Sequence, residues 1–391
     1  MALITIGIFL SAGLFMGWSL GANDAANIFG TAVGTRMIRF RTAAIVCSVF
    51  VIIGAVAGGA GTSNTLGELG AINAIAGAFA VTVSAAFTVM MMTKRGLPVS
   101  TSQAIVGAII GWNIFAGLQT DTAVAVKIVQ TWAFTPILAA AFAVIIYWIV
   151  KYFIEHTKIH VVRMDKYIRY GLIIAGAFGA YSLGANNIAN VMGVFIKVSP
   201  FSDIVITNSI TITGVQQLFL LGGIAIAVGV FTYSKRVMMT VGDSIFKLSP
   251  ISAFIVVLAT SLVLFVFSSE GLYNFLTSRN LPAFPLVPVS QSQAVVGAIM
   301  GIGLAKGGRN IDISKIGKIA MGWVLTPLIS LIISFIVMNV LQNVFLKNVI
   351  SNRKRKIFCH LTQTKRVTFE VKIEKNWENP LSTIKIEKNN V

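Results

Sequence analysis

The sequence contains few charged residues for its length. Asp, Glu, Lys and Arg make up 11% of its 391 residues, whereas hydrophobic residues make up 56%. A soluble chain of this length needs a polar shell, and so small a charged fraction is too little to build one. The chain has only two cysteines, Cys47 and Cys359, which are too few and too separated to indicate a disulfide framework or a metal site. The composition therefore indicates a membrane protein.

The sequence also lacks the motifs of ATP-driven and hydrolytic proteins. It has no Walker motif for ATP and no nucleophile–base arrangement for hydrolysis. Its three histidines, His156, His160 and His360, fall in predicted loops or in the tail, so none is placed as a proton relay inside a membrane. We therefore expect no enzyme activity, no cofactor and no bound metal beyond a transported ion.

Apolar stretches suited to crossing a bilayer recur along the chain. They are Ala43–Ala57, Ala71–Met92, Ala123–Val150, Gly171–Ala180, Gln217–Phe231, Ile251–Phe267 and Ile313–Val344. The segment Met1–Leu20 has no basic start and no small-residue cleavage site, so we read it as the first spanning helix rather than a signal peptide. The predicted fold is an all-α integral membrane protein with about 10–12 transmembrane or half-membrane helices.

Two motifs occur twice and in the same order, which indicates a duplication. Gly21–Gly30 (GANDAANIFG) returns as Gly184–Gly193 (GANNIANVMG), Pro98–Gly111 (PVSTSQAIVGAIIG) returns as Pro288–Gly301 (PVSQSQAVVGAIMG), and Trp132–Pro136 is echoed more weakly by Trp323–Pro327. We therefore expect a first repeat over residues 1–165, a second over 166–347, and a basic C-terminal tail over 348–391.

The loop charges predict that the two repeats have inverted topology. Arg36, Arg39 and Arg41 place the first loop in the cytoplasm and the N-terminus outside, and Gly61–Gly70, without Lys or Arg, reads as an external loop. Lys94 and Arg95 are expected to return the chain to the cytoplasm, and Lys151–Arg169 is expected to be a basic cytoplasmic loop. The second repeat then enters from the opposite side, so each repeat has an odd number of crossings and the binding site lies near the midplane, between broken or re-entrant helices.

Two features of the charge distribution stand apart from this topology. The run Arg353–Lys356 would favour a cytoplasmic tail, although inverted symmetry places the tail outside, and we keep the external assignment. The net charge of +18 could indicate nucleic acid binding. The basic residues, however, lie mainly in loops and in the tail, where positive-inside topology and anionic headgroups account for them, so we expect no nucleic acid partner.

The Pro98 and Pro288 segments predict a binding site for an anion. In each, Pro is followed by consecutive Ser, Thr or Gln residues and then by an apolar helix. Polar backbone at membrane depth is tolerated only where it is buried in protein or lines a cavity. The N–H groups at a helix start favour an anion, so two such helix starts meeting near the midplane would make a neutral site rich in donors.

The Gly-Ala-Asn motifs supply the complementary oxygen ligands. Their side chains offer carboxylate and amide oxygens suited to an alkali cation, and the amide N–H₂ groups can also reach an oxyanion. Asp24 is the outstanding residue because a carboxylate within an apolar span is costly, and its counterpart in the second repeat is the neutral Asn187. A packing face with interhelical hydrogen bonds is the competing explanation, which the duplication of both motifs disfavours.

Other conspicuous residues are more readily explained by packing. The pairs Gly107–Gly111 and Gly297–Gly301 have the G-x-x-x-G spacing of closely packed helices. Trp132 and Trp323, with their neighbouring prolines, are expected to be kinks or anchors.

At these motifs the sequence closely resembles the inorganic phosphate transporter (PiT) family, over essentially the chain to about residue 347. The resemblance implies a phosphate symporter driven by Na⁺ or H⁺, multi-pass in the inner or plasma membrane and often homodimeric. It implies that inorganic phosphate sits among Thr101, Ser102, Gln103, Ser292 and Gln293, within reach of the Asn23 and Asn186 amides. It implies that the coupling cation sits near Asp24, Asn27, Asn187 and Asn190, with help from Ser100 and Ser290.

Several alternatives remain open on sequence grounds. The residues by themselves predict a small oxyanion with a cation, so sulfate competes with phosphate, as does a metal-phosphate complex. Many neutral oxygen ligands and the absence of an intramembrane histidine favour Na⁺ over H⁺. Asp24 would favour phosphate because it can accept a hydrogen bond from P–OH, a group that sulfate lacks at neutral pH. An anion channel, a membrane enzyme and a receptor are disfavoured, because no continuous polar lining or catalytic cluster is evident.

Overall fold

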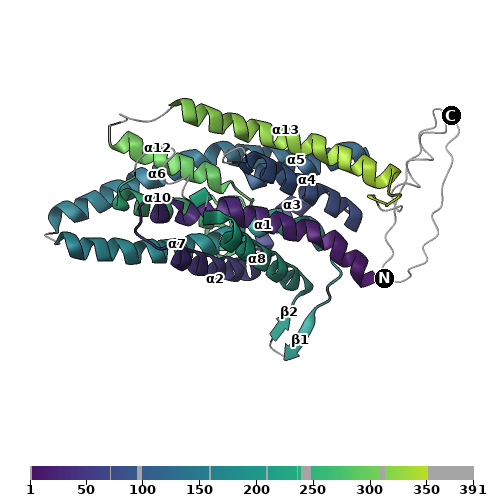
Figure 1. The fold of residues 1–391 in the computed structure, drawn as a ribbon, viewed down its shortest axis with the longest axis horizontal. Helices are drawn as coiled ribbons and strands as arrows, with labels where there is room; N and C mark the ends of the chain where they lie inside the picture. Colours follow the sequence, from purple (N-terminus) through teal and green to yellow (C-terminus); the bar gives the residue numbers. More distant parts are fainter. Residues whose placement is uncertain are drawn as a thin grey trace. The chain divides into compact units, whose positions relative to one another are not determined.

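The computed structural model describes residues 2–70, 72–94, 99–157, 160–207, 210–235, 237–238, 248–307 and 313–350. These residues are almost entirely helical (Figure 1). The first part of the chain forms α1 (Ala2–Gly34), α2 (Phe40–Gly58), α3 (Ala60–Leu69), α4 (Ile75–Lys94), α5 (Thr101–Ala116) and α6 (Thr122–His156). The predicted tail, apart from residues 348–350, falls outside the described residues, as do Arg95 and Pro98.

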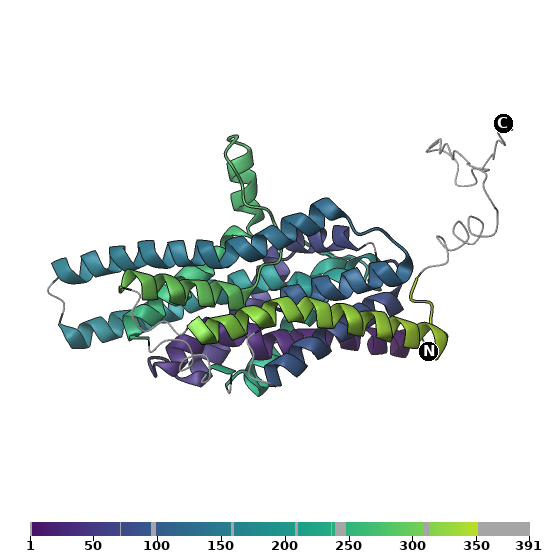
Figure 2. The ribbon, with the colours of Figure 1, turned by 90° about the horizontal axis from the view of Figure 1, so that it is seen from above.

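The second part repeats this pattern with insertions. It forms α7 (Val161–Met192), the 3₁₀ helix η1 (Gly193–Val198), the hairpin strands β1 (Ile204–Thr207) and β2 (Ile210–Ile212), α8 (Gly214–Thr232), α10 (Pro250–Val266), α11 (Glu270–Thr277), α12 (Gln291–Ala305) and α13 (Ile313–Asn343). The strands pair antiparallel. In Figure 2, α11 stands out from the side of the bundle in green.

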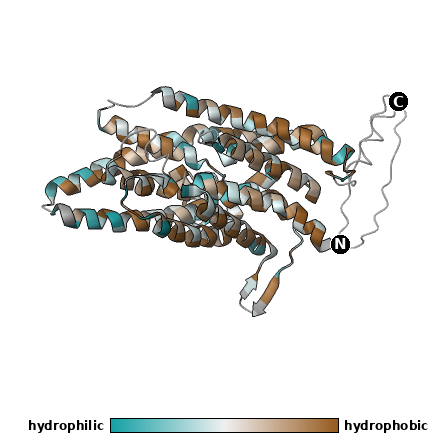
Figure 3. Ribbon diagram, in the orientation of Figure 1, coloured by the Kyte–Doolittle hydropathy of each residue, from teal (hydrophilic) through white to brown (hydrophobic). Residues whose placement is uncertain are grey.

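Seven of the described helices are long and apolar enough to cross a membrane, and the pair α10–α11, bent by 63°, forms an eighth candidate. The seven internal apolar stretches in the sequence fall on α2, α4, α6, α7, α8, α10 and α13, and the predicted first span falls on α1. The hydropathy colouring shows brown helices along the bundle (Figure 3). The prediction of an all-α membrane protein with half-membrane and broken segments is confirmed.

The repeated Pro-Val-Ser segments produce two short helices that begin inside the bundle. Ser100 and Ser290 are extended N-cap residues, and their hydroxyls accept the backbone N–H of Gln103 at 3.2 Å and of Gln293 at 3.3 Å. With 16 and 15 residues, α5 and α12 are roughly 24 Å long or less, too short to cross the hydrocarbon core. They run in opposite directions from their starting points (Figure 1).

Each short helix packs against a long helix from the other half of the chain. A Cβ at Gly107 or Gly111 of α5 would collide with the carbonyl of Pro327 or Leu331 in α13. In the same way, Gly297 and Gly301 of α12 lie against the Pro136 and Ala140 carbonyls of α6. The prediction that both G-x-x-x-G pairs are packing faces is confirmed, and the two halves interlock.

Two expectations about loops are wrong. Residues Gly61–Gly70, expected to form an external loop, are mostly the helix α3. The expected basic loop from Lys151 to Arg169 consists largely of the ends of α6 and α7. Ion pairs between Lys151 and Glu155 (3.8 Å) and between Asp165 and Arg169 (3.4 Å) have the i,i+4 spacing that supports a polar helix, so the helices continue past their apolar segments.

The expectation that Lys94 and Arg95 return the chain to the cytoplasm stays a prediction. Helices α1 and α4 run parallel, with Phe9 against Phe79 (ring centroids 5.7 Å apart). Lys94, the last residue of α4, lines a cavity with Trp18 and Ala22 of α1 and with Tyr233, the residue after α8.

Candidate functional site

The second half of α1 and the last turns of α7 meet the first residues of α5 and α12 inside the bundle. Every residue that the sequence nominated for anion or cation binding is buried there, with at most 4% of its surface exposed. These residues are Asn23, Asp24 and Asn27 on α1, Asn186, Asn187 and Asn190 on α7, Ser100, Thr101, Ser102 and Gln103 at the start of α5, and Ser290, Ser292 and Gln293 at the start of α12. We call this set the central cluster.

The first asparagine of each Gly-Ala-Asn motif holds the chain that leads into a short helix. The Asn23 amide donates to the carbonyl of Val99 at 3.1 Å. The Asn186 amide donates to the carbonyl of Val287 at 3.1 Å, and its oxygen accepts the backbone N–H of Val289 at 2.8 Å. These contacts satisfy peptide groups that would otherwise be unpaired at membrane depth. The structure thus places Asn23 and Asn186 as anchors for the starts of α5 and α12.

A second group of hydrogen bonds joins the two halves of the chain. The Ser102 hydroxyl of α5 donates to the carbonyl of Val289, just before α12, at 3.0 Å. The Asn190 amide of α7 donates to the Ser102 hydroxyl at 2.9 Å and to the Thr101 hydroxyl at 3.4 Å. The two helix starts are therefore close together, and α7 contacts the start of α5.

The Asp24 carboxylate is held by neutral donors. It accepts hydrogen bonds from the Asn23 amide at 3.0 Å and from the Thr101 hydroxyl. Among the described residues, no Lys, Arg or His forms a salt bridge with it. A buried carboxylate without a cationic partner is costly, and a site that retains one is a candidate for cation or proton binding.

Unpartnered polar atoms gather in the same cluster. The side-chain oxygens of Gln103, Asn187, Asn190, Gln291 and Gln293 are buried and have no hydrogen-bond partner, and neither do the side-chain nitrogens of Asn27, Asn187 and Gln291. Native proteins leave few such atoms without a partner, and a group of them needs an explanation such as a bound ion or water. Amide oxygens suit a cation, whereas amide N–H₂ groups suit an oxyanion.

The two halves differ in a way that the repeats reveal. Aligning the repeats pairs Asp24 with Asn187 and Thr101 with Gln291. The first-half pair, Asp24 and Thr101, is hydrogen bonded, whereas neither amide atom of Asn187 and neither of Gln291 has a partner. The unsatisfied polar groups therefore lie mainly on the second-half side of the cluster.

The sequence places Gln291 in the polar run at the start of α12, but Gln291 was not among the residues predicted to bind the ions. It is buried at the first position of α12, with 1% of its surface exposed. The repeat alignment pairs Gln291 with Thr101, and this pairing could have identified it as a site residue. The anchoring roles of the Val99, Val287 and Val289 backbones were also missed, because backbone groups carry no signature in side-chain patterns.

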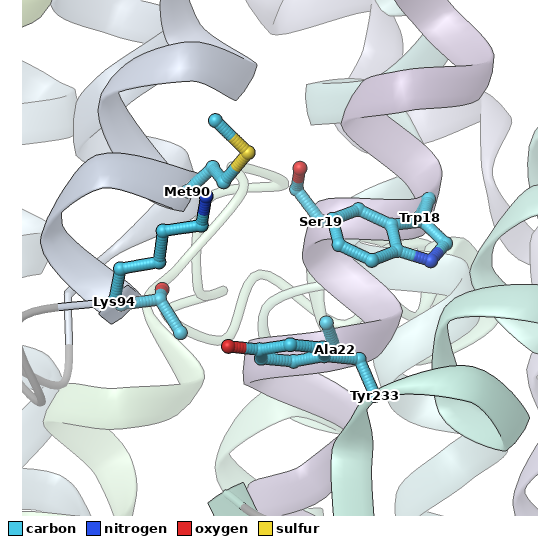
Figure 4. A pocket seen from close by; sticks show the side chains of 7 residues that line it. Trp18, Ser19, Ala22, Met90, Lys94 and Tyr233 are labelled. Atoms are coloured by element: carbon cyan, nitrogen blue, oxygen red, sulfur yellow. The ribbon is translucent and has the colours of Figure 1, made fainter.

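A small cavity lies beside the cluster, between α1, α4 and the end of α8 (Figure 4). It encloses about 30 Å³, enough for a water molecule. Within its lining, the Ser19 and Thr93 hydroxyls are buried and have no hydrogen-bond partner. The Trp18 ring packs on the Tyr233 ring with centroids 5.7 Å apart, and its N–H donates to Thr232 at 2.9 Å. Aromatic side chains thus close this flank, next to Ala22 and Asn23.

Substitutions at two adjacent asparagines should separate structural from binding roles. Asn186→Ala removes both anchoring hydrogen bonds and should lower the free energy of unfolding by about 1–3 kcal/mol, measured by thermal denaturation without ligand ions. Asn187→Ala removes no hydrogen bond within the protein, so stability should be unchanged although transport is impaired. Equal destabilisation by both variants, or full transport by Asn187→Ala, would contradict this division.

The sequence is similar to a family of known proteins and to individual members of it. The sequence model of a family described as the phosphate transporter family matches residues 20–273 and 283–387. The "Putative phosphate permease MJ0630" of Methanocaldococcus jannaschii is 29% identical over 335 residues, which cover 85% of this chain and 97% of the relative. The "Sulfate permease CysP" of Bacillus subtilis is 28% identical over 348 residues, covering 85% of this chain and 86% of the relative.

A solved structure has the same fold. It is described as "The sodium-dependent phosphate transporter", and it superposes with a TM-score of 0.69 at 24% sequence identity. The match covers 86% of this chain and 99% of the solved chain. The helical architecture described above is therefore that of a known membrane protein over nearly its full length.

Proposed function

Because the chain belongs to the phosphate transporter family, we propose that it imports inorganic phosphate in symport with Na⁺, as a secondary active transporter that works by alternating access. The family match confirms the resemblance on which the sequence prediction rested, and it confirms a transporter rather than an enzyme. The apolar helices and the family together indicate a multi-pass membrane protein. The cargo, the coupling ion and the residue roles below belong to the proposal.

The observation that carries the proposal is the convergence of two helix starts on a buried cluster with unpartnered polar atoms. In our proposal, phosphate binds between the starts of α5 and α12, at Thr101, Ser102, Gln103, Ser292 and Gln293, and Asn23 and Asn186 position these segments. The first N–H groups of each helix have no intrahelical acceptor and lie at the positive end of its dipole. Hydroxyl and amide donors complete a neutral, donor-rich site for the anion.

Na⁺ is assigned to the oxygens beside this site. Asp24, Asn27, Asn187 and Asn190, with the Ser100 and Ser290 hydroxyls, supply hard oxygen ligands. The unpartnered oxygens of Asn187 and Asn190 favour the second-half side for at least one ion. Na⁺ would partly offset the phosphate charge within the membrane, and its gradient would add to the driving force. The description of the similar solved structure as sodium-dependent supports this ion.

The interlocked halves suit alternating access around a fixed central site. We propose two inverted repeats, residues 1–165 and 166–347, in the inner or plasma membrane with the N-terminus outside, and a homodimer as the assembly. In such repeats, one group of helices moves against the other while the site stays near the midplane. The contacts of α5 with α13 and of α12 with α6 would transmit that motion between the halves.

Sulfate is the second candidate cargo, because one similar relative is named a sulfate permease. Both anions are tetrahedral, and the helix starts do not distinguish them. Asp24 does distinguish them in our proposal, since its carboxylate can accept a hydrogen bond from a protonated phosphate. Coupling to H⁺ is the alternative for the ion, with Asp24 as the protonated group.

Uptake of radiolabelled phosphate into proteoliposomes tests the function. We expect accumulation above the external concentration under an inward Na⁺ gradient, little accumulation under an H⁺ gradient, and no inhibition by excess sulfate. Accumulation under the H⁺ gradient alone would replace the coupling ion. Sulfate uptake without phosphate uptake would overturn the cargo, and dissipation of any phosphate gradient without accumulation would indicate a channel.

A further inference from the structure

A second cavity lies at the opposite end of α12 from the central cluster. It encloses about 260 Å³ between α6, the start of α10 and the residue that ends α12. Two lysines from different helices line it, Lys151 of α6 and Lys306 after α12. It lies at the end of the bundle where α6 ends and α7 begins, and Figure 3 shows hydrophilic residues gathered on those helix ends.

The charges in this cavity are arranged to receive an anion. The Lys306 ammonium donates to the Ser252 hydroxyl at 2.8 Å, which holds it against the first turn of α10. The Lys151 ammonium lies 4.9 Å from the centroid of the Trp148 ring and 3.8 Å from the Glu155 carboxylate. Glu155 also lines the cavity, so among the described residues that line it two are lysines and one is a carboxylate. The ion pair of Lys151 is half exposed and contributes little, so an anion can displace it at low cost.

Three aliphatic side chains form much of the remaining wall, beside Tyr147 and Ser249. Val150 and Ile154 of α6 and Ile251 of α10 line the cavity together with the polar groups. On the same stretch of α6, Ile149, Tyr152 and Phe153 have 49% to 59% of their surface exposed, as expected of side chains that face lipid. The cavity therefore combines a cationic end with an apolar wall that continues along the outside of the bundle. A lipid with an anionic headgroup has this combination, whereas a free inorganic anion needs only the cationic end.

We propose that this cavity binds the phosphate headgroup of an anionic phospholipid, with its acyl chains along α6. The lipid would contact α6, the first turn of α10 and Lys306 at the end of α12. The opposite end of α12 carries Ser292 and Gln293 of the central cluster. The proposal depends on the chain being a membrane protein and not on the identity of its cargo.

The test compares the double variant Lys151→Gln/Lys306→Gln with the wild type in nanodiscs of phosphatidylcholine, with and without phosphatidylglycerol. Native mass spectrometry after release would measure the phosphatidylglycerol retained, and thermal denaturation would measure the stabilisation it confers. Two lost lysine contacts should weaken phosphatidylglycerol binding about 30-fold. The control is Lys166→Gln/Arg169→Gln on α7, which removes the same charge and also breaks an exposed i,i+4 ion pair, but outside the cavity. It should retain wild-type binding.

Inorganic phosphate distinguishes the source of the anion. Stabilisation of the double variant by sodium phosphate should match that of the wild type, which would also show that the variant is folded. Equal phosphatidylglycerol binding by all three proteins would overturn the proposal. A loss of phosphate stabilisation confined to the double variant would assign the cavity to a free oxyanion and would equally overturn the lipid assignment. Lipid retention is measured without transport. If none of the three proteins transported phosphate, that result would count against the proposed function and not against the lipid site.

Discussion

Replacing Asp24 with Asn is expected to reduce Na⁺-driven phosphate uptake by about 10- to 100-fold while leaving the protein folded. The range corresponds to the loss of one interaction with a charged group, of roughly 1.5–3 kcal/mol. The substituted side chain keeps one oxygen, which can accept a hydrogen bond from the Thr101 hydroxyl. The Asn23 amide loses its bond to residue 24 but keeps its bond to the Val99 carbonyl, so the packing should not change. Removing a buried carboxylate that has no salt bridge to a described residue should leave the thermal stability unchanged or raise it.

A matched control is Asp165→Asn, which removes an exposed carboxylate from the α7 ion pair with Arg169. Its uptake should equal that of the wild type, because exposed ion pairs contribute little. Sulfate competition should be measured for both variants, since Asp24 is also proposed to select phosphate. An Asp24→Asn protein that transports normally and still prefers phosphate would contradict both roles of this carboxylate.

Gly107→Ala and Gly297→Ala are each expected to reduce the yield of folded protein and to abolish transport. A Cβ at either position would collide with a backbone carbonyl, that of Pro327 or Pro136, and a carbonyl cannot move aside as a flexible side chain can. Overpacking of this kind costs about 1–3 kcal/mol per site. The displaced α5 or α12 would also carry its polar first turn out of register with the rest of the central cluster.

Gly317→Ala is the control for this pair. Gly317 lies in α13 with nothing within 4 Å of the added Cβ, so alanine should be neutral or slightly stabilising through its better helix propensity. The readouts are the monodisperse fraction in detergent and the midpoint of thermal denaturation. Wild-type stability of Gly107→Ala and Gly297→Ala would mean that α5 and α12 do not pack on α13 and α6 as described.

Much of this architecture follows from local pattern. The spans are long apolar segments, and α5 and α12 begin where a Pro-Val-Ser sequence supplies an N-cap, so their positions could be predicted. The residues of the central cluster could be nominated because two motifs recur in the same order. Their roles as phosphate and cation ligands stay predictions.

What the sequence did not reveal depends on contacts between distant segments. The partners of the helix glycines lie roughly 160 to 220 residues away in the chain. The hairpin β1–β2 and the projecting α11 are insertions without counterparts in the first half, so the repeats could not predict them. Gln291 was overlooked because its polarity was read as part of a run rather than compared with Thr101.

Structure determination by electron cryomicroscopy in sodium phosphate tests most directly whether the central cluster is the phosphate and Na⁺ site. We predict density for a tetrahedral anion bounded by Thr101, Ser102 and Gln103 of α5 and by Ser292 and Gln293 of α12. A smaller feature should lie among the oxygens of Asp24, Asn187 and Asn190, and it should be lost when sodium is replaced by choline. Anion density elsewhere, with the amides of Asn187 and Gln291 bonded only to each other or to protein, would contradict the account.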